Sequence, residues 1–153
     1  MIEVREAEPG DRRETARIAR RVNAAIQKVY QVQSSGSKQR FASTKHRQLV
    51  ATVDGAIIGA AHIAHHGERT HLVGLFVDPD YHGCGVAGHL VEAVAQVARK
   101  RGAKRVTLRT VRETGNVHVF EQLGFEVIEE HETDTVQGAG GALLSETSME
   151  RLL

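Results

Sequence analysis

The segment Val77–Leu90, VDPDYHGCGVAGHL, constrains the fold of this chain more than any other part of the sequence. An apolar stretch precedes it and an amphipathic stretch follows it, so it is expected to join a strand to a helix. Gly83, Gly85 and Gly88 let backbone amides approach a ligand without interference from a Cβ atom. The amino end of the following helix adds roughly half a positive charge. The segment therefore predicts a turn that can hold a pyrophosphate.

The first elements of the chain are expected to be a strand and a helix. Ile2–Ala7 reads as a short strand, which Pro9-Gly10 ends. Asp11, with Glu14 three residues later, resembles a capping box and predicts the start of a helix. Apolar residues continue at helical spacing to about Gln33. The opposite face carries Arg13, Arg17 and Arg20, which we interpret as a solvated helix face rather than a site for an anionic partner.

An antiparallel meander is expected directly before the glycine-rich turn. Asp54-Gly55 is a strong hairpin signal between Gln48–Val53 and Ala56–His65, both rich in Val, Ile and Ala. A second turn near Gly67-Glu68 leads into a third strand, Thr70–Val77. The polar segment Ser34–Lys45, which has no periodicity, is expected to be a loop that faces the substrate.

After the turn, helices and strands alternate. The segment Val86–Arg101 has one apolar and one charged face, which predicts a helix that ends at Gly102. Further elements are expected as a strand at Lys104–Val111, a short helix at Val117–Leu123, a strand at Phe125–His131 and a last strand at Leu143–Leu152.

Length and composition favour an ordinary globular enzyme or binding protein. The 153 residues suit one domain, residues 1–153, with 41% hydrophobic and 25% charged residues. A net charge of +1 and an aromatic content of 4% argue against a nucleic-acid or membrane partner. With Cys84 as its single cysteine, the chain has neither an internal disulfide nor a cysteine-based zinc site. No signal peptide or membrane span is recognised, so a cytoplasmic location is expected.

Taken literally, the turn spells GxGxxG, the fingerprint of dinucleotide-binding proteins. In that class the motif follows the first strand of a parallel sheet, and an acidic residue lies about twenty residues further on. Here the motif follows an antiparallel meander, and the corresponding Leu108-Arg109 offers no carboxylate. A nicotinamide enzyme is therefore the least favoured of the readings.

The order of the elements resembles that of the GNAT superfamily of acetyl-CoA-dependent N-acetyltransferases. The family's turn has a Gln or Arg followed by x-x-Gly-x-Gly or Ala, and His82–Ala87 matches it except at His82. The segment Asn116–Phe125 resembles the family's short helix with its Gly-Phe ending. The resemblance implies an α/β fold with a GNAT-like mixed, mostly antiparallel central sheet, splayed at the cofactor site and covered by helices on both faces.

The resemblance also implies which residues contact acetyl-CoA, the expected co-substrate, with no metal. Leu75, Phe76 and Val77 would pair with the pantetheine arm, Asn116 would hydrogen-bond it, and Phe120 would lie near the thioester. The pyrophosphate would be held by the turn residues His82, Gly83, Cys84, Gly85, Val86, Ala87 and Gly88. Two positions also have ordinary structural readings, since Leu75–Val77 could be a core strand and Asn116 a helix cap. Cys84 is interpreted as a tolerated small residue rather than a reactive thiol.

The catalytic groups are less clearly marked than the cofactor site. Family members commonly protonate the departing thiolate with a tyrosine, and Phe120 stands at that position here. His118, water or no dedicated group could take over this role. Some members carry a carboxylate base four residues before the position of Leu75, where this chain has His71, and a histidine can deprotonate an ammonium near neutral pH.

Three histidines are expected on one face of the meander. If Gly67-Glu68 closes a two-residue hairpin, His62, His66 and His71 share that face. A common metal ion is disfavoured, because two residues four apart on one strand are separated by roughly 13 Å. Ordinary strand histidines are the alternative to His71 as the base, with Glu68 and Glu113 as less favoured bases.

The sequence therefore predicts an N-acetyltransferase that moves the acetyl group of acetyl-CoA to a primary amine by direct attack in a ternary complex. The acceptor, a small molecule or a peptide, has no recognisable signature. The alternative is a non-catalytic acyl-CoA-binding or sensing module of the same fold. A homodimer is an expectation that rests on the family alone.

Overall fold

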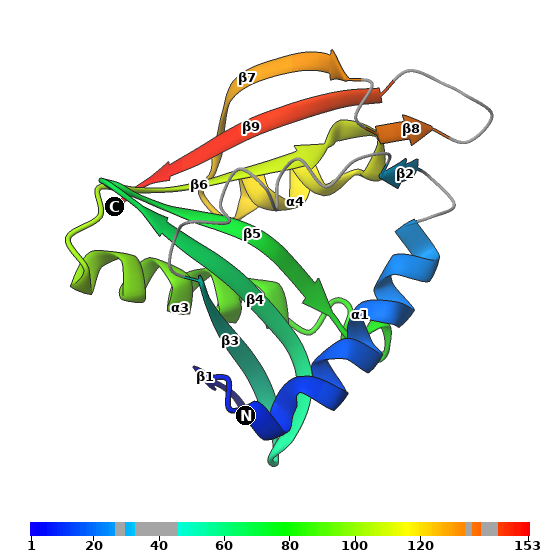
Figure 1. Cartoon of the computed structure of the whole chain (residues 1–153), viewed down its shortest axis with the longest axis vertical. Helices are drawn as coiled ribbons and strands as arrows, with labels where there is room; N and C mark the ends of the chain where they lie inside the picture. Colours follow the sequence, from blue (N-terminus) through cyan, green and yellow to red (C-terminus); the bar gives the residue numbers. More distant parts are fainter. Residues whose placement is uncertain (27–29, 33–45, 134–135, 139–143) are drawn as a thin grey trace.

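The computed structural model describes residues 1–26, 30–32, 46–133, 136–138 and 144–153. Within these residues it contains three α-helices, three short 3-10 helices and nine strands (Figure 1). The strands are β1 (Ile2–Glu6), β2 (Tyr30–Val32), β3 (His46–Val53), β4 (Ala56–His66), β5 (Arg69–Val77), β6 (Arg105–Val111), β7 (Glu126–Thr133), β8 (Val136–Gly138) and β9 (Leu144–Leu152). The helices are α1 (Arg12–Ile26), α3 (Val86–Lys100) and α4 (Asn116–Gln122), with η1 (Pro9–Asp11), η2 (Pro79–Tyr81) and η3 (Arg112–Thr114).

Seven strands form one mixed sheet in the order β1-β3-β4-β5-β6-β9-β7. Every neighbouring pair is antiparallel except β5 and β6, which are parallel. Both predicted hairpins are confirmed. Asp54 and Gly55 have φ angles of 50° and 82°, which a tight hairpin turn requires, and His66 pairs with Arg69 across the second turn.

Helices cover both faces of the sheet, as predicted. On one face α3 and α4 pack on the main core, whose members include Leu49, Ile63, Leu72, Leu90, Val94, Val106, Phe120 and Met149. Side chains alternate along a strand, so Val50 and Ala60 point to the other face, where Ile18 of α1 is also fully buried. Figure 1 shows α1 crossing the ends of β4 and β5 on that side.

The sheet is splayed between β5 and β6. These strands pair only from Arg69 to Leu72 with Arg105 to Leu108, although β5 continues to Val77. The register between β4 and β5 shifts at the same place, since His62 pairs with Gly74 and Ile63 with Leu72. The extra residue, Val73, is a bulge that bends β5 away from β6. The splay predicted from the family resemblance is therefore present, and a bulge marks its start.

Helix α1 begins at Arg12, next to the predicted start at Asp11, but its capping differs from the sequence prediction. Asp11 does not form a capping box with Glu14. Instead, Asp11 Oδ2 accepts a hydrogen bond of 2.7 Å from the amide of Glu8, and a 3-10 turn precedes the helix. The acidic side chain thus stabilises the turn on its own amino-terminal side.

The prediction that the helix extends to about Gln33 is wrong at Tyr30–Val32, which form β2. This strand pairs with Val136–Gly138 (β8) in a separate two-stranded sheet. The predicted substrate-facing loop Ser34–Lys45 lies outside the described residues.

Candidate active site

The carboxyl half of β5 presents one open edge to the splay. Leu75, Phe76 and Val77 pair with Ala61, Ala60 and Gly59 of β4 on one side. On the other side, beyond Leu72, no pairing with β6 is found within the described residues. Backbone amides and carbonyls on an unpaired edge can bind an extended ligand as an added strand.

The glycine-rich turn follows this edge directly. Gly83 and Gly85 have φ angles of 78° and 81°, in the left-handed region that favours glycine. Gly85 caps α3, whose first backbone hydrogen bond at this end runs from the amide of His89 to the carbonyl of Gly85 at 3.1 Å. The amides of the first turn of a helix have no partner within the helix, so they can bind an anion here.

A surface groove of about 820 Å³ lies beside α3 and is also lined by Ile2 and Val4 of β1. Gly85 and Gly88 line it, together with Gln122, Leu123 and Gly124 at the end of α4. A Cβ atom built on Gly88 would lie 3.6 Å from Leu123 Cδ2, so the two helices approach closely there. The volume is in the range of ligand-binding sites in proteins.

Asp78, between β5 and the turn, is a buried charged residue whose contacts the sequence did not reveal. It is 4% exposed, and Arg21 of α1 donates a hydrogen bond of 2.7 Å from Nη1 to its Oδ1. Arg17 Nη2 lies 3.7 Å from Oδ2 of the same carboxylate. The side chain also accepts a hydrogen bond from the amide of Asp80 at 3.0 Å. Arg21 Nη2 also donates a hydrogen bond of 3.3 Å to Asp80 Oδ1, and this hydrogen bond, together with the charge of Asp78, raises the pKa of Arg21.

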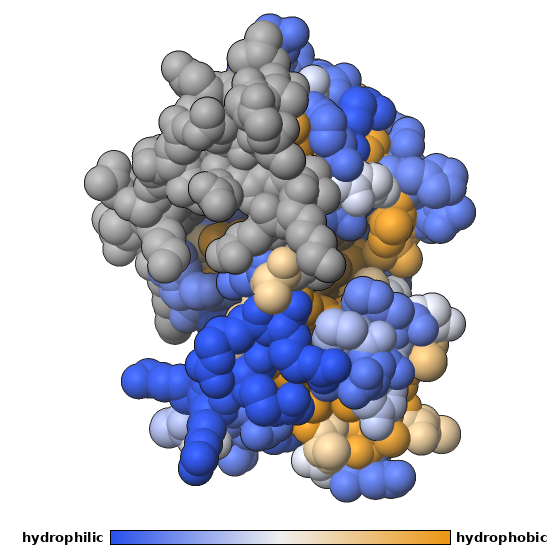
Figure 2. Space-filling view, turned by 90° about the vertical axis from the view of Figure 1, so that its right-hand side faces the viewer, coloured by the Kyte–Doolittle hydropathy of each residue, from blue (hydrophilic) through white to orange (hydrophobic). Residues whose placement is uncertain are grey.

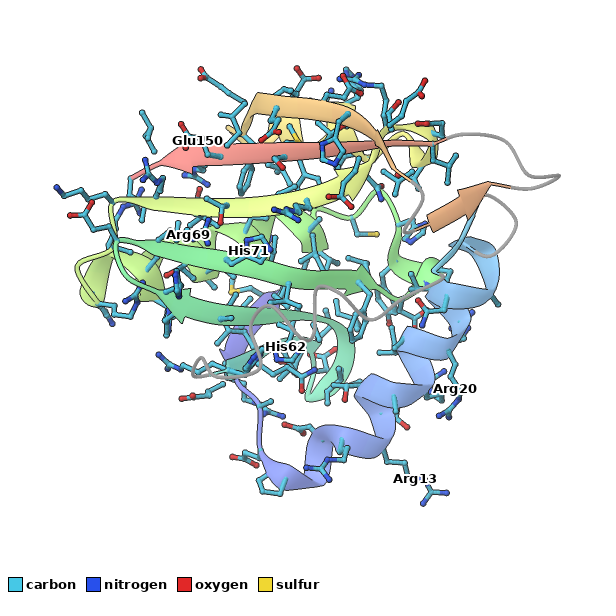
Figure 3. All side chains as sticks on the ribbon, turned by 45° about the horizontal axis from the view of Figure 1, so that its top comes forward. Arg13, Arg20, His62, Arg69, His71 and Glu150 are labelled. Atoms are coloured by element: carbon cyan, nitrogen blue, oxygen red, sulfur yellow. The ribbon has the colours of Figure 1, made fainter. Side chains whose placement is uncertain are left out.

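Four of the five arginines of α1 fall into two groups. Arg17 and Arg21 turn toward Asp78, whereas Arg13 and Arg20 extend away from the sheet (Figure 3). Figure 2 looks at the side of the molecule that carries α1 and shows a strongly hydrophilic area over this helix. The solvated helix face predicted from the sequence is confirmed, because Arg13, Arg17 and Arg20 are all exposed, although Arg17 also reaches Asp78.

His71 lies at the closed end of the splay, one residue before the last pair between β5 and β6. It is buried, and its Nδ1 lies 2.8 Å from Thr107 Oγ1 on β6. The predicted register is confirmed, because Ala64 pairs with His71 and His66 with Arg69. His62 lies on the same face and contacts His46, with 3.0 Å between His46 Nδ1 and His62 Nε2 (Figure 3). Within the described residues, no group of three or more His, Cys, Asp or Glu side chains is arranged to hold a metal ion.

The predicted residues of α4 lie on the other face of the sheet from His71. Phe120 is 9% exposed and packs edge-to-face on Phe125, with 5.7 Å between ring centroids. His118 is exposed, and its Nε2 lies 3.3 Å from Gln122 Nε2. Asn116 is the first residue of α4 and Gly115 is its cap, so the reading of Asn116 as a helix cap is wrong. The candidate base and the candidate acid are thus not in contact; they lie on the two sides of the splayed strands.

Comparisons with known proteins agree with this arrangement. The model of the acetyltransferase (GNAT) family matches residues 16–125. An acetyltransferase of Pectobacterium atrosepticum, ECA0875, is 31% identical over 83 residues, which are 53% of this chain and 58% of that protein. The matched region therefore spans little more than half the length of this relative. No helix among the described residues is long and apolar enough to cross a membrane.

Solved structures share the fold at low sequence identity. A GCN5-related N-acetyltransferase of Kribbella flavida superposes with a TM-score of 0.78 at 19% identity, over 99% of this chain and 98% of that chain. A protein of Bacillus anthracis, solved in complex with acetyl coenzyme A, superposes with a TM-score of 0.74 at 13% identity, over 100% of both chains. Together with the splayed sheet and the glycine-rich turn, the match of the family model over most of the chain establishes that this protein belongs to the GNAT acetyltransferase family.

Proposed function

We propose that this protein is an N-acetyltransferase that transfers the acetyl group of acetyl-CoA to a primary amine by direct attack in a ternary complex. The observation that carries the proposal is the continuity of two backbone sites. The open edge of β5 at Leu75–Val77 leads within a few residues to the left-handed glycines of the turn and the amino end of α3. An extended amide-containing arm joined to a pyrophosphate has the chemistry to fill both.

The residues present fit acetyl-CoA. Leu75, Phe76 and Val77 would pair with the pantetheine arm, and the turn from His82 to Gly88 would hold the pyrophosphate. Asn116 and Phe120 are assigned to the arm and to the neighbourhood of the thioester by family resemblance. When bound, acetyl-CoA supplies an activated acyl group with a thiolate leaving group.

In this proposal His71 is the general base. The acceptor amine must lose its proton to become a nucleophile, and a neutral imidazole accepts a proton near neutral pH. The place of His71 supports the assignment, because it is buried at the point where β5 and β6 separate. Activity should then rise with pH as His71 loses its proton.

Phe120 cannot protonate the departing thiolate, because its ring carries no acidic hydrogen. The ring packs on Phe125 instead. His118 is the candidate acid, and its solvent exposure would let it exchange protons with water. A coenzyme A thiolate is also a stable enough anion to leave without a dedicated acid. A His118→Gln variant distinguishes the two, because only a dedicated acid makes kcat fall.

The alternative is a non-catalytic acyl-CoA-binding or sensing module. Phe120 favours it, since the position that commonly holds a proton donor in the family holds a buried hydrocarbon ring here. Such a module would keep the open β5 edge and the glycine-rich turn but would not need a basic His71.

Two experiments test the proposal. Calorimetric titration with acetyl-CoA, coenzyme A and NADPH should give binding of the first two only. A thiol-release assay over a panel of small-molecule and peptide amines should then show turnover that His71→Gln abolishes while acetyl-CoA binding persists. Binding without turnover on any amine would identify the sensing module.

Under this proposal, residues 1–153 form one N-acetyltransferase domain, and the family match over residues 16–125 supports this. The acceptor remains a primary amine of a small molecule or a peptide. The cytoplasmic location, the lack of nucleic-acid or membrane partners and the homodimer stay predictions from the sequence and the family.

A further inference from the structure

His89, in the first turn of α3, contacts the residue that caps this helix. Its Nδ1 lies 2.9 Å from the carbonyl oxygen of Gly85, and its own backbone amide lies 3.1 Å from the same oxygen. A carbonyl oxygen only accepts hydrogen bonds, so the short contact requires that Nδ1 carry a proton. Among the described residues, the ring makes this hydrogen bond and no ion pair. The carbonyl of Gly85 therefore has two donors, and both come from His89.

The cap that receives this hydrogen bond has little else to hold it. Helices are commonly capped by Ser, Thr, Asp or Asn, whose side chain accepts a hydrogen bond from an amide of the first turn. Gly85 makes no such side-chain hydrogen bond, and its φ is 81°. Glycine loses more conformational freedom on folding than any other residue. The hydrogen bond from His89 thus restricts the backbone where a glycine restricts it least.

The orientation of the Gly85 carbonyl also sets the direction of the next amide. Among the described residues no peptide bond is cis, and in a trans peptide the C=O and N–H bonds point in opposite directions. The carbonyl of Gly85 points into α3 toward His89, so the N–H of Val86 points out of the amino end of the helix. This N–H is the first of the amides at that end that have no partner within the helix.

We propose that His89 is a positioning residue of the pyrophosphate site: its Nδ1–H holds the carbonyl of Gly85 and thereby keeps the N–H of Val86 aimed at the anion. The identity of the anion rests on the proposed binding of acetyl-CoA. The hydrogen bond itself does not, because it is a contact within the chain. Nδ1 donates both in the neutral ring and in the charged ring, so this positioning does not depend on the charge of His89.

The competing role for the ring is a direct contact with a phosphate through Nε2. While Nδ1 holds the proton of the neutral ring, Nε2 offers a phosphate only a lone pair, and it donates only when the ring is charged. A direct contact would therefore strengthen in acid, whereas positioning would not. The other titratable side chains of the turn and the groove are His82, Cys84, Glu92 and Arg151, of which the last two pair with each other at 2.6 Å. They are unchanged in the variants below, so their ionisation is common to all of them.

Spectra of the free protein test the hydrogen bond itself. Long-range 1H–15N correlation spectra of uniformly 15N-labelled protein, recorded where the histidines are neutral, distinguish the two tautomers, and the spectrum of His89→Asn assigns the signals of His89. We expect the neutral ring to carry its proton on Nδ1. A ring protonated on Nε2 would overturn the proposal, whether or not the protein binds acetyl-CoA.

Two substitutions separate positioning from direct contact. Counted in bonds from the backbone, the side-chain nitrogen of Asn stands where Nδ1 stands, and that of Gln stands where Nε2 stands. Calorimetric titration with acetyl-CoA should therefore find His89→Asn close to the wild type and His89→Gln about fivefold weaker, the equivalent of one ordinary hydrogen bond. The reverse order would overturn the proposal in favour of a direct contact.

His89→Phe removes both ring nitrogens and supplies the pH test. Its affinity for acetyl-CoA should be about fivefold below that of the wild type, and by the same factor at pH 6 and at pH 8. A loss that grows in acid would indicate the charged ring in direct contact with a phosphate and would overturn the proposal. Chemical shifts of the last turns of α3 verify that the helix stays folded in each variant.

Inorganic pyrophosphate separates this proposal from the proposed function. Titrated into 15N-labelled protein, it should shift the amide signal of Val86 in the wild type and in His89→Asn, and shift it less in His89→Phe. A wild type whose Val86 amide responds to pyrophosphate but which does not bind acetyl-CoA would count against the proposed function alone. A wild-type Val86 amide that does not respond, or a response equal in all variants, would overturn the positioning role of His89.

Discussion

Arg21 Nη1 donates a hydrogen bond of 2.7 Å to Asp78 Oδ1, and this contact joins α1 to the residue from which the glycine-rich turn begins. The carboxylate is almost fully buried and also accepts a hydrogen bond from the amide of Asp80, so it stabilises the short 3-10 helix before the turn. The contact between Arg21 and Asp78 therefore links the amino-terminal helix to the proposed pyrophosphate site.

Replacing Arg21 by Met should destabilise the protein and weaken acetyl-CoA binding. The buried carboxylate of Asp78 would lose its principal cation, so the free energy of unfolding should fall, by an amount that solvent screening of the partly exposed Arg21 reduces. Urea denaturation measures the stability and calorimetry measures the binding. Arg13→Met, on the solvent side of the same helix, is the matched control. Equal effects of the two substitutions would contradict the coupling.

Gly59→Ala should destabilise the fold. A Cβ atom at Gly59 would lie 2.9 Å from the carbonyl oxygen of Phe76 and 3.2 Å from Val86 Cγ1, and a paired strand cannot shift readily. Overpacking of this kind costs about 1–3 kcal/mol. Gly74→Ala is the control in the same sheet, because its Cβ would meet nothing within 4 Å. Thermal melts of the two variants should differ clearly, and coincident melts would rule out close packing at Gly59.

Gly85→Ala should weaken acetyl-CoA binding by about tenfold, which corresponds to about 1.4 kcal/mol. Its φ of 81° is costly for alanine, so the turn would relax and move the amides at the start of α3. Gly102→Ala imposes the same strain at a φ of 84° beyond the other end of α3. Titration calorimetry should show weaker binding only for Gly85→Ala; a similar loss in both variants would indicate a general effect of strain.

Alkylation of Cys84 should block acetyl-CoA binding. The thiol is exposed within the turn, so a bulky adduct would occupy space beside the amides. Binding measured before and after complete modification by N-ethylmaleimide tests this. Cys84→Ala, treated in the same way, should keep its affinity. Unchanged affinity of the fully modified wild type would contradict the assignment of the turn.

Asp11 should contribute stability that disappears in acid. The hydrogen bond from Arg5, and next that from the amide of Glu8, lower the pKa of Asp11 from 3.8 to about 2. Because the folded-state pKa is the lower one, the stabilisation is complete above the unfolded value and is lost as the pH falls from about 4 toward 2. The urea midpoints of wild type and Asp11→Asn should therefore differ at pH 7 and converge in that window. A constant difference down to pH 2 would show that the charge of Asp11 is not involved.

Local sequence patterns predicted the elements of this fold well. Both hairpins could be located because Asp54-Gly55 and Gly67-Glu68 provide the backbone angles that tight turns need, and strand periodicity then set the register of His71. The glycine-rich turn was equally clear, since the residue types that tolerate positive φ are few. The prediction for the capping of α1 was wrong because two carboxylates, Asp11 and Glu14, lie near the helix start. Only the structure shows that Asp11 accepts the hydrogen bond from the amide of Glu8.

The sequence by itself determined the seven strands of the main sheet, the main helices and the glycine-rich turn, since each depends on residues close together in the chain. Tertiary structure alone decided where β5 leaves β6, which carboxylate holds Arg21 and which side chain meets His71. Thr107 is 36 residues from His71, and Asp78 is 57 residues from Arg21. Contacts at such separations depend on strand order, on a one-residue bulge and on helix packing, none of which leaves a periodic signal in the sequence.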